Sequence, residues 1–424
     1  MKHLIAALLF AWVVVFAAVE SARADNWPQW RGPANDGVCK EKNLSSEWSD
    51  TKNIVWKLKL PGRGGSTPAV WGERIFLTSA DGNDVVLLCV STKGKELWKR
   101  KLGADTLIRM RDEGNGASAS PSTDGKHVYA FTGAGDLACF DFEGKEIWKL
   151  NAQERYGKFK TWHGFHTTPL LDGDRLYIQL IHSGGARVVA LDKANGKDVW
   201  NVQRKSDATN ENEHSYASPC IWRKGKDAYL ITHGGDYAIA HSLKDGSEIW
   251  RVGDLNPRDN YNGFLRFVAS PVATPDLIIV PSAKDHDVVG VKPTASGMVK
   301  AGSKHEQWRL TKGTPDVPSP LVHDGLVYLC SEWGLLTCLD AKNGKKHYEK
   351  QRLHKARYRA SPVYADGKIY LTARDGVISV VKAGPEFKLL AENKLPDDIA
   401  ASPAIANGRI YLRGFGSLYA IGDK

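Results

Sequence analysis

Six of the thirteen histidines lie in the middle of the chain, close to aromatic and acidic residues. Imidazole binds divalent metals, forms hydrogen bonds and changes its charge near neutral pH. Such side chains beside Trp162, Glu213 and Tyr216 are typical of a polar, aromatic-lined ligand pocket or a metal site. Polar residues also collect in loops and bond locally, so a purely local role stays open. The six are His163, His166, His182, His214, His233 and His286.

The cysteines and histidines match no familiar metal motif, because there is neither a CxxC pair nor a Cys2His2 pattern. The turns 81–84 and 285–287 carry carboxylates of the kind that Ca²⁺ prefers, but Asp-rich turns form equally well without metal. The sequence therefore leaves any metal unknown and indicates no catalytic residue.

Three of the six cysteines occupy equivalent places on expected strands, which is typical of small apolar core residues. These are Cys89, Cys139 and Cys338. Cys330 and Cys338 flank an expected hairpin turn, and both a disulfide and two separate thiols are compatible with that placement.

The first 24 residues have the pattern of a secretory signal peptide. A basic start at Lys2 is followed by an apolar stretch at 4–19 and by Ala22-x-Ala24, which predicts cleavage after Ala24. A retained membrane anchor is the alternative, but the apolar stretch is shorter than the roughly 20 residues that a spanning helix needs. We expect a periplasmic or secreted protein, comprising residues 25–424, without a transmembrane anchor.

The formal charge of +10 is scattered along the chain. One run, from Arg352 to Arg359, combines cations with Tyr358 and resembles a nucleic-acid-binding patch. An exported protein rarely meets nucleic acid, so we expect a solvated loop and no nucleic-acid partner. Attraction to an anionic lipid or glycan stays open.

An internal repeat runs along the whole chain. A Ser-Pro or Thr-Pro pair recurs every 41–53 residues, each time before an apolar run. The prolines of this Ser/Thr-Pro mark are Pro68, Pro121, Pro169, Pro219, Pro271, Pro320, Pro362 and Pro403.

Five of the repeats close with a Gly followed four residues later by an aromatic residue, as in Gly94 and Trp98 or Gly196 and Trp200. Four short strands fit into one repeat, which is the length and strand order of a propeller blade. The strands are almost continuously apolar, as expected where each blade is buried between two others.

The repeats predict an all-β fold: one eight-bladed β-propeller of four-stranded antiparallel blades. The eighth repeat ends before it can supply an outer strand. The segment 53–57 has the pattern of such a strand and precedes the first mark, so we expect this N-terminal strand to close the ring. We expect the protein to be a monomer.

The segment Ala190 to Trp200, with its Asp192, Gly196 and Trp200, resembles the docking motif of pyrroloquinoline-quinone (PQQ) type propeller repeats. The opening Trp27-Pro28-Gln29-Trp30-Arg31-Gly32-Pro33 is similar to the start of secreted bacterial proteins with these repeats. The resemblance implies that each repeated Trp packs against the neighbouring blade and has a structural role. The repeat occurs both in quinoprotein dehydrogenases and in non-catalytic propellers, such as the lipoprotein that assists outer-membrane barrel assembly, so the fold alone does not choose the function.

The strand order places the connections that precede each mark on one rim, around a central funnel. The candidate ligand-binding residues lie in these connections or in the hairpin turns of the same rim, and the same connections carry Arg63, Asn115, Asp316 and Arg357. The candidates are Trp162, His163, His166, His182, Glu213, His214, Tyr216, His233, Arg266 and Trp333.

These features predict a non-catalytic binding or scaffold protein that holds a protein, a small molecule or a glycan at its funnel. The alternative is a small PQQ-dependent alcohol or sugar dehydrogenase. The resemblance implies that such an enzyme holds PQQ over Ca²⁺ bound by Glu, Asn and Asp, and several members carry a disulfide between adjacent cysteines. No two cysteines are adjacent here, and no such ligand set is evident. The chain also lacks a lipidation Cys at the cut, since its first Cys is Cys39.

Overall fold

A computed structural model places residues 26–105 and 114–423 of the chain, and these are the residues described below. The predicted signal peptide, residues 1–24, lies outside them. Within these ranges the structure contains no helix that is long and apolar enough to span a membrane.

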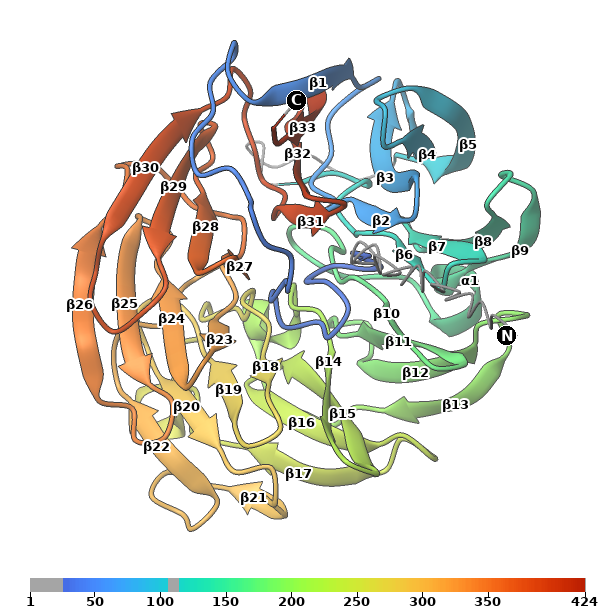
Figure 1. Cartoon of the computed structure of the whole chain (residues 1–424). Coiled ribbons are helices and arrows are strands. Elements are labelled where there is room, and N and C mark those ends of the chain that lie inside the picture. The colour runs from blue at the N-terminus through green and yellow to red at the C-terminus, as the bar shows by residue number, and fades with distance from the viewer. Residues whose placement is uncertain (1–25, 106–113, 424) are drawn as a thin grey trace, which may run out of the picture.

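The described residues form eight antiparallel sheets arranged as a closed ring, which confirms the predicted eight-bladed propeller (Figure 1). Each sheet, or blade, runs from a short strand at the ring axis to a longer strand at the circumference. We number the blades 1 to 8 from the N-terminal side. The innermost strands are β2 (Ala69–Trp71), β6 (Ser122–Thr123), β10 (Leu170–Asp172), β14 (Cys220–Lys224), β18 (Val272–Ala273), β23 (Leu321–His323), β27 (Val363–Ala365) and β31 (Ala404–Ala406).

The two middle strands of each blade carry most of the core. In β3 and β4 six consecutive residues are buried, because neighbouring blades cover both faces of the sheet. The second strands are β3 (Arg74–Asp81), β7 (His127–Phe131), β11 (Arg175–Leu180), β15 (Asp227–Gly234), β19 (Ile278–Pro281), β24 (Leu326–Cys330), β28 (Lys368–Thr372) and β32 (Arg409–Arg413). The third strands are β4 (Asp84–Ser91), β8 (Asp136–Asp141), β12 (Arg187–Asp192), β16 (Tyr237–Ser242), β20 (Val288–Val291), β25 (Leu335–Asp340), β29 (Val377–Lys382) and β33 (Ser417–Ile421).

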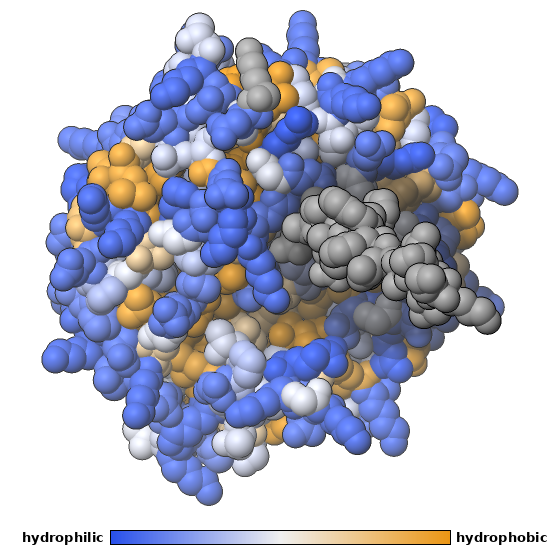
Figure 2. Space-filling model, viewed as in Figure 1, coloured by the Kyte–Doolittle hydropathy of each residue, from blue (hydrophilic) through white to orange (hydrophobic). Residues whose placement is uncertain are grey.

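The outer strands are amphipathic, since one of their faces meets water. The end face of the ring seen in Figure 2 is also covered mostly by hydrophilic side chains, with hydrophobic groups visible between them. The outer strands are β5 (Glu96–Ala104), β9 (Glu146–Asn151), β13 (Asp198–Gln203), β17 (Glu248–Val252), β22 (Glu306–Leu310), β26 (Lys346–Arg352), β30 (Leu389–Lys394) and β1 (Ile54–Lys59). Helical structure is limited to α1 (Ala152–Tyr156) and two 3₁₀ turns, Asn210–Glu213 and Arg258–Asn260.

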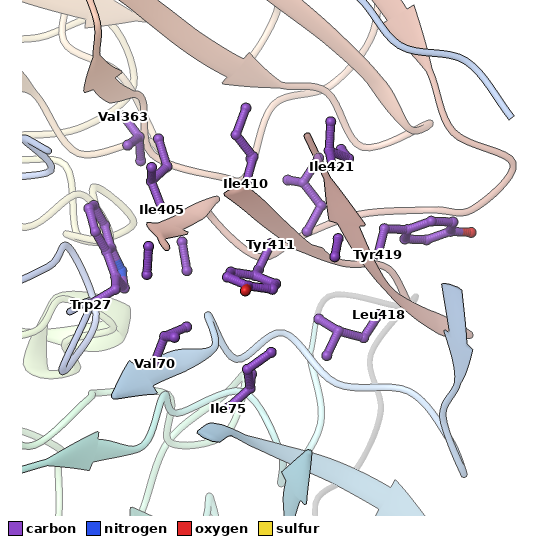
Figure 3. Packing of buried hydrophobic residues seen from close by; sticks show 14 of the residues in the cluster. Trp27, Val70, Ile75, Val363, Ile405, Ile410, Tyr411, Leu418, Tyr419 and Ile421 are labelled. Atoms are coloured by element: carbon purple, nitrogen blue, oxygen red, sulfur yellow. The ribbon is translucent and has the colours of Figure 1, made fainter. Parts of the chain in front are cut away.

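The ring closes as the sequence predicts. Strand β1 pairs antiparallel with β33, from Ile54 opposite Ile421 to Lys59 opposite Ser417, and so completes blade 8. The seam between blades 8 and 1 is apolar: Trp27 lies near Ile405 of β31 and Val70 of β2 (Figure 3).

The Ser/Thr-Pro marks form a belt of hydrogen bonds around the axis. In seven successive links, the hydroxyl of the Ser or Thr in one blade accepts the backbone N–H of the equivalent residue in the preceding blade, at 2.8–3.1 Å. At the ring closure the direction changes, and the Thr67 hydroxyl donates to the Ser402 carbonyl at 3.2 Å. We call these eight residues the serine belt: Thr67, Ser120, Thr168, Ser218, Ser270, Ser319, Ser361 and Ser402.

The repeated tryptophans link neighbouring blades at the circumference, as the family resemblance implies. Each indole packs on the turn glycine of the next blade, whose φ lies between 66° and 81°, and donates its N–H to a carbonyl there at 2.8–3.0 Å. A side chain at that glycine would fall within 3 Å of the ring, so both residues are required. The pairs are Trp56 with Gly94, Trp98 with Gly144, Trp148 with Gly196, Trp200 with Gly246, and Trp308 with Gly344.

Blade 5 departs from this pattern in a way that the repeat does not predict. In place of the glycine turn it has a longer connection, from which β21 (Gly297–Val299) pairs parallel with β17 of blade 4. Trp250 therefore lies opposite Gly297 and is fully buried without a glycine turn to pack on.

The N-terminal segment fills the end of the channel opposite the funnel rim. Residues 26–39, the N-terminal plug, reach the middle of the ring (Figure 1) and bond to the inner strands of several blades. Trp27 pairs with Val70, and the Arg31 guanidinium donates to the Pro320 carbonyl at 2.7 Å. The Trp27–Pro33 motif is thus a channel closure.

All six cysteines are buried, and Cys330 and Cys338 are separate thiols with no disulfide between them. Burial raises the pKa of Cys89, Cys139, Cys220 and Cys338 to about 12. These thiols remain protonated and behave as core residues, as expected for three of them.

Candidate functional site

One cavity of about 200 Å³ lies on the ring axis at the rim end, and we call it the axial cavity. Every blade contributes to it through the residue two positions before its belt residue. Because side chains two apart in extended backbone point the same way, eight equivalent positions converge on the axis. These residues are Gly65, Ser118, His166, Tyr216, Val268, Val317, Arg359 and Ala400.

The lining of the axial cavity combines polar and apolar groups. Arg63, Asn115, His166 and Arg359 bring hydrogen-bonding groups, whereas Val268, Val317, Ala400 and Phe415 bring apolar surface. The Arg63 guanidinium lies over the Phe415 ring, 4.2 Å from its centroid. Such a lining suits a small ligand with a flat apolar part and a polar or anionic edge.

Asn115 shapes the polar part of the lining through its own loop. Its side-chain amide donates to the Arg63 carbonyl at 2.9 Å, and its Oδ1 accepts the Ala117 N–H at 3.0 Å. Both ends of the amide are therefore committed to backbone, and Asn115 positions the Arg63 loop.

The aromatic side of blades 3 and 4 is tightly packed. His166 Nε2 donates to the His163 carbonyl at 2.7 Å, and both imidazoles pack against the Tyr216 ring. Burial raises the pKa of Tyr216 above its ordinary value, so its hydroxyl stays neutral. The structure thus brings His163, His166 and Tyr216 together, as predicted.

A chain of ionisable side chains extends around the rim from blade 3 to blade 7. His163 Nε2 lies 3.1 Å from Glu211, Arg266 lies 3.8 Å from the same carboxylate and 3.7 Å from Asp316, and Glu332 lies 2.9 Å from Arg359. We call these six residues the charge arc.

Asp316 is the most perturbed member of the charge arc. Its pKa is raised to about 6, chiefly by burial; Arg266 opposes the rise and the neighbouring Glu332 contributes to it. Asp316 and Glu332 also line a second cavity of about 370 Å³, the rim pocket, together with Trp333. Trp333 is 56% exposed and lies beneath the Arg357 guanidinium, 5.0 Å from its centroid.

Two candidates lie away from the axis, in a groove between blades 3 and 4. His182 and Glu213 line this interblade pocket, which has a volume of about 470 Å³. The pKa of His182 is lowered to about 4, chiefly by burial and in smaller part by His214 and Lys160, so the ring is neutral at pH 7. His214 is buried beside it and contacts the ring of Trp162, which is 51% exposed.

The prediction for His233 is wrong. This residue lies on the last part of β15, fully buried, and its ring stacks on Phe267 with a centroid distance of 4.7 Å. Burial lowers its pKa to about 3. His233 is a core residue that no ligand at the rim can contact.

Sequence reasoning missed Glu211, Arg359 and Phe415. Glu211 lies two residues from Glu213, and nothing in the sequence favours it over that candidate. Arg359 lies in the basic run 352–359, which was expected to be a solvated loop. Tyr358 of that run is in fact buried. A usable signal existed for Arg359, because it stands two positions before a belt serine, as His166 and Tyr216 do. No comparable signal exists for Phe415, which reaches the cavity from a hairpin turn of blade 8.

The described side chains do not fit a PQQ–Ca²⁺ centre. Among residues 26–105 and 114–423, no three His, Cys, Asp or Glu side chains are grouped so that they could hold a metal ion. Asn115, the one amide side chain in the axial lining, has its Oδ1 occupied by Ala117. The described lining of the axial cavity also contains no Asp or Glu that could bind Ca²⁺.

Comparison with known proteins agrees with the fold. In structure, the chain is similar to BamB from Moraxella catarrhalis (TM-score 0.61, 16% identity, 88% of this chain and 97% of that one). It is also similar to quinohemoprotein alcohol dehydrogenase from Comamonas testosteroni (TM-score 0.66, 13% identity, 96% and 82%).

In sequence, a polyvinylalcohol dehydrogenase from Sphingopyxis sp. (strain 113P3) is 26% identical over 198 residues, which are 43% of this chain. The matched part spans only 29% of that enzyme's length. A family model described as outer membrane protein assembly factor BamB matches residues 82–344 and 295–384. The chain therefore belongs to this family of PQQ-like β-propellers.

Proposed function

We propose that this protein is an exported, non-catalytic binding propeller that holds a small ligand in its axial cavity. One observation carries the proposal: eight structurally equivalent positions converge on one cavity, and they carry seven different residue types. A purely structural channel would not need this variety, because the serine belt beside it uses only Ser and Thr. The combination of cationic, hydrogen-bonding and apolar groups in the lining suits a small aromatic or alicyclic carboxylate.

Two further features support binding in preference to chemistry. The N-terminal plug closes the far end of the channel, so a ligand in the cavity has one entrance. The charged and aromatic rim around that entrance, with exposed Trp162 and Trp333, offers additional surface for a glycan or for a protein partner. A protein partner at the rim would agree with the assembly role named in the family description.

The test is direct binding of a panel of small aromatic carboxylates, beginning with benzoate and phthalate, followed by calorimetry and thermal shift. We expect at least one saturable 1:1 complex. Val317→Trp, which fills the cavity from blade 6, should abolish it, while Val199→Trp on the outer face of blade 3 should not. Absence of binding across the panel, or equal binding by both variants, would refute the proposal.

Export is a separate part of the proposal. The signal pattern at residues 1–24 supports it, and the expected mature N-terminus is Asp25. Mass spectrometry of the protein expressed with its full leader should find a chain that begins there. A protein recovered only with residues 1–24 attached would contradict export by cleavage.

The second candidate is a PQQ-dependent dehydrogenase. The sequence match to polyvinylalcohol dehydrogenase is the observation that favours it. The purified protein should be titrated with PQQ and Ca²⁺ while dye-linked oxidation of alcohols and sugars is measured. Turnover that depends on PQQ would replace the binding proposal with this one; we expect none.

A further inference from the structure

The interblade pocket contains a buried cation without a bound counter-ion. Arg204 directly follows β13 and is 3% exposed. Its Nε donates to the Thr232 hydroxyl at 3.0 Å and its Nη2 to the Tyr237 carbonyl at 2.6 Å. Its Nη1 has no hydrogen-bond partner among the described residues.

The carboxylates nearest to Arg204 are occupied elsewhere. Glu248 binds the Arg251 guanidinium through both oxygens at 2.6 Å, and Asp236 accepts from Asn212 at 3.1 Å and Asn256 at 3.0 Å. Burial lowers the pKa of Arg204 to about 9, so the group still carries its charge at pH 7. A buried charge without an anion in contact is costly, and the cost falls when an anion binds beside it.

The surroundings of Arg204 have the chemistry of an oxyanion site. Lys205 lines the same pocket as Arg204, and Glu213 is the one carboxylate in the lining. Ser183 and Ser206 also line it, but their hydroxyls donate to the Lys160 carbonyl at 3.2 Å and to the Gly235 carbonyl at 2.6 Å. Gly235 has no side chain beside the guanidinium, and a Cβ there would lie 3.3 Å from Nη1 of Arg204. Arginine and lysine are the usual charged donors to phosphate and sulfate oxygens.

We propose that the interblade pocket binds a tetrahedral oxyanion, phosphate or sulfate, either free or as the ester group of a larger molecule. Arg204 supplies the fixed buried charge, and Lys205 supplies a second positive charge from the lining of the pocket. The site is separate from the axial cavity, so its occupancy does not depend on the proposed function.

Calorimetric titration at low ionic strength with inorganic phosphate, inorganic sulfate and glycerol 1-phosphate tests this proposal. We expect saturable 1:1 binding of at least one probe, weakened about tenfold in Arg204→Gln and about fivefold in Lys205→Gln. Glu213→Gln should instead tighten binding about twofold to fivefold, because it removes the like charge. A preference for glycerol 1-phosphate over both inorganic ions would identify an ester as the ligand form.

Lys197→Gln is the matched control, since it removes one positive charge from the same blade at the opposite rim. Equal weakening in Lys197→Gln and Lys205→Gln would show only a general charge effect and would overturn the proposal. Failure of all three probes to bind the wild type would also overturn it. If Arg204→Gln does not fold, the opposite effects of Lys205→Gln and Glu213→Gln still decide the question. Val317→Trp should bind the oxyanion normally, which separates this test from that of the axial cavity.

Discussion

The serine belt and the axial lining lie two residues apart on the approach to every inner strand, yet they follow opposite rules. At the belt, all eight blades carry Ser or Thr, and seven of them make the same hydrogen bond. Two positions earlier, the blades carry Gly, Ser, His, Tyr, Val, Arg and Ala. In a repeat protein, a residue that every repeat retains serves the joint between repeats, and a residue that differs is free to serve a ligand.

The same rule separates the tryptophans. Those of the outer strands recur at one place in the repeat and are covered by the next blade, whereas Trp162 and Trp333 occur once each and are more than half exposed. The predictions below test whether repeated positions carry stability and unrepeated ones do not.

The largest effect is expected from Trp308→Ala. The indole is nearly buried, packs on Gly344 and donates to the Ala341 carbonyl at 2.8 Å. Removing it should lower the free energy of unfolding by about 3–5 kcal/mol, measured by urea denaturation. Trp333→Ala, at the exposed rim, should cost less than about 1 kcal/mol. Similar losses of unfolding free energy in the two variants would contradict the distinction between repeated and unrepeated tryptophans.

The charge arc should reduce stability at neutral pH. Because the folded-state pKa of Asp316 is raised to about 6, the folded protein holds a proton that the unfolded chain has released above pH 4. Stability due to this group is therefore present below about pH 4 and is lost as the pH rises through 6, a change of about 2–3 kcal/mol. The difference in unfolding free energy between wild type and Asp316→Asn should follow this course between pH 4 and 7. A flat difference would contradict it.

Gly196 and Gly173 form a matched pair that tests the packing of the repeated tryptophans on the turn glycines. Both have positive φ, but a Cβ at Gly196 would lie 2.7 Å from the Trp148 ring, whereas a Cβ at Gly173 meets nothing within 4 Å. Gly173→Ala should show only the backbone strain of about 1–2 kcal/mol. Gly196→Ala should lose about 1–3 kcal/mol more, because the ring must move. Thermal denaturation of both variants checks this. Equal losses of stability would mean that the Trp148 side chain can move aside at no cost.

The hydrogen bond at the ring closure runs in a different direction from the seven regular links of the serine belt, and the two kinds of link can be compared by mutation. Ser218→Ala leaves the buried Thr168 N–H without its acceptor, which should cost about 1–2 kcal/mol. Thr67→Val removes only a donor to the Ser402 carbonyl and leaves the shape of the side chain unchanged, so it should cost less than about 1 kcal/mol. A larger loss at Thr67 would make the ring closure, rather than the regular links, the critical joint.

What the sequence reveals about this molecule follows from the repeat. Eight Ser/Thr-Pro marks and the Gly–Trp spacing predict the blades, their number and the closure by β1. They can do so because every blade of the ring needs the same contacts with its neighbours, and those contacts recur at the same place in each repeat. The residues of the axial lining recur with the same period, and they can be identified in the sequence by counting two positions back from each belt residue. Irregular features were not readable: neither β21 nor the N-terminal plug repeats, and each is fixed by contacts between distant segments.

The candidate site was predictable only in part, for a related reason. Loop position placed His163, His166, Tyr216 and Arg266 correctly at the rim. It could not show that His233 turns inward onto Phe267, because one residue at a strand end decides between core and solvent. Nor could it show that His182 and Glu213 belong to a separate pocket, since that depends on the width of the groove between two blades.

The smallest effect on stability is expected two residues before the belt, in blade 3. His166→Ala removes a ring that is only partly buried and lines the axial cavity, so the free energy of unfolding should change by less than about 1 kcal/mol. Thr168→Val, two positions later, deprives the buried Ser120 N–H of its acceptor and should cost about 1–2 kcal/mol. The order should reverse for affinity: His166→Ala should weaken a ligand of the axial cavity about tenfold, and Thr168→Val should leave it unchanged. Because the two side chains are neighbours in one extended segment, a reversal between stability and affinity cannot arise from location alone. It would mean that the fold assigns stability to the position that repeats and binding to the position that varies.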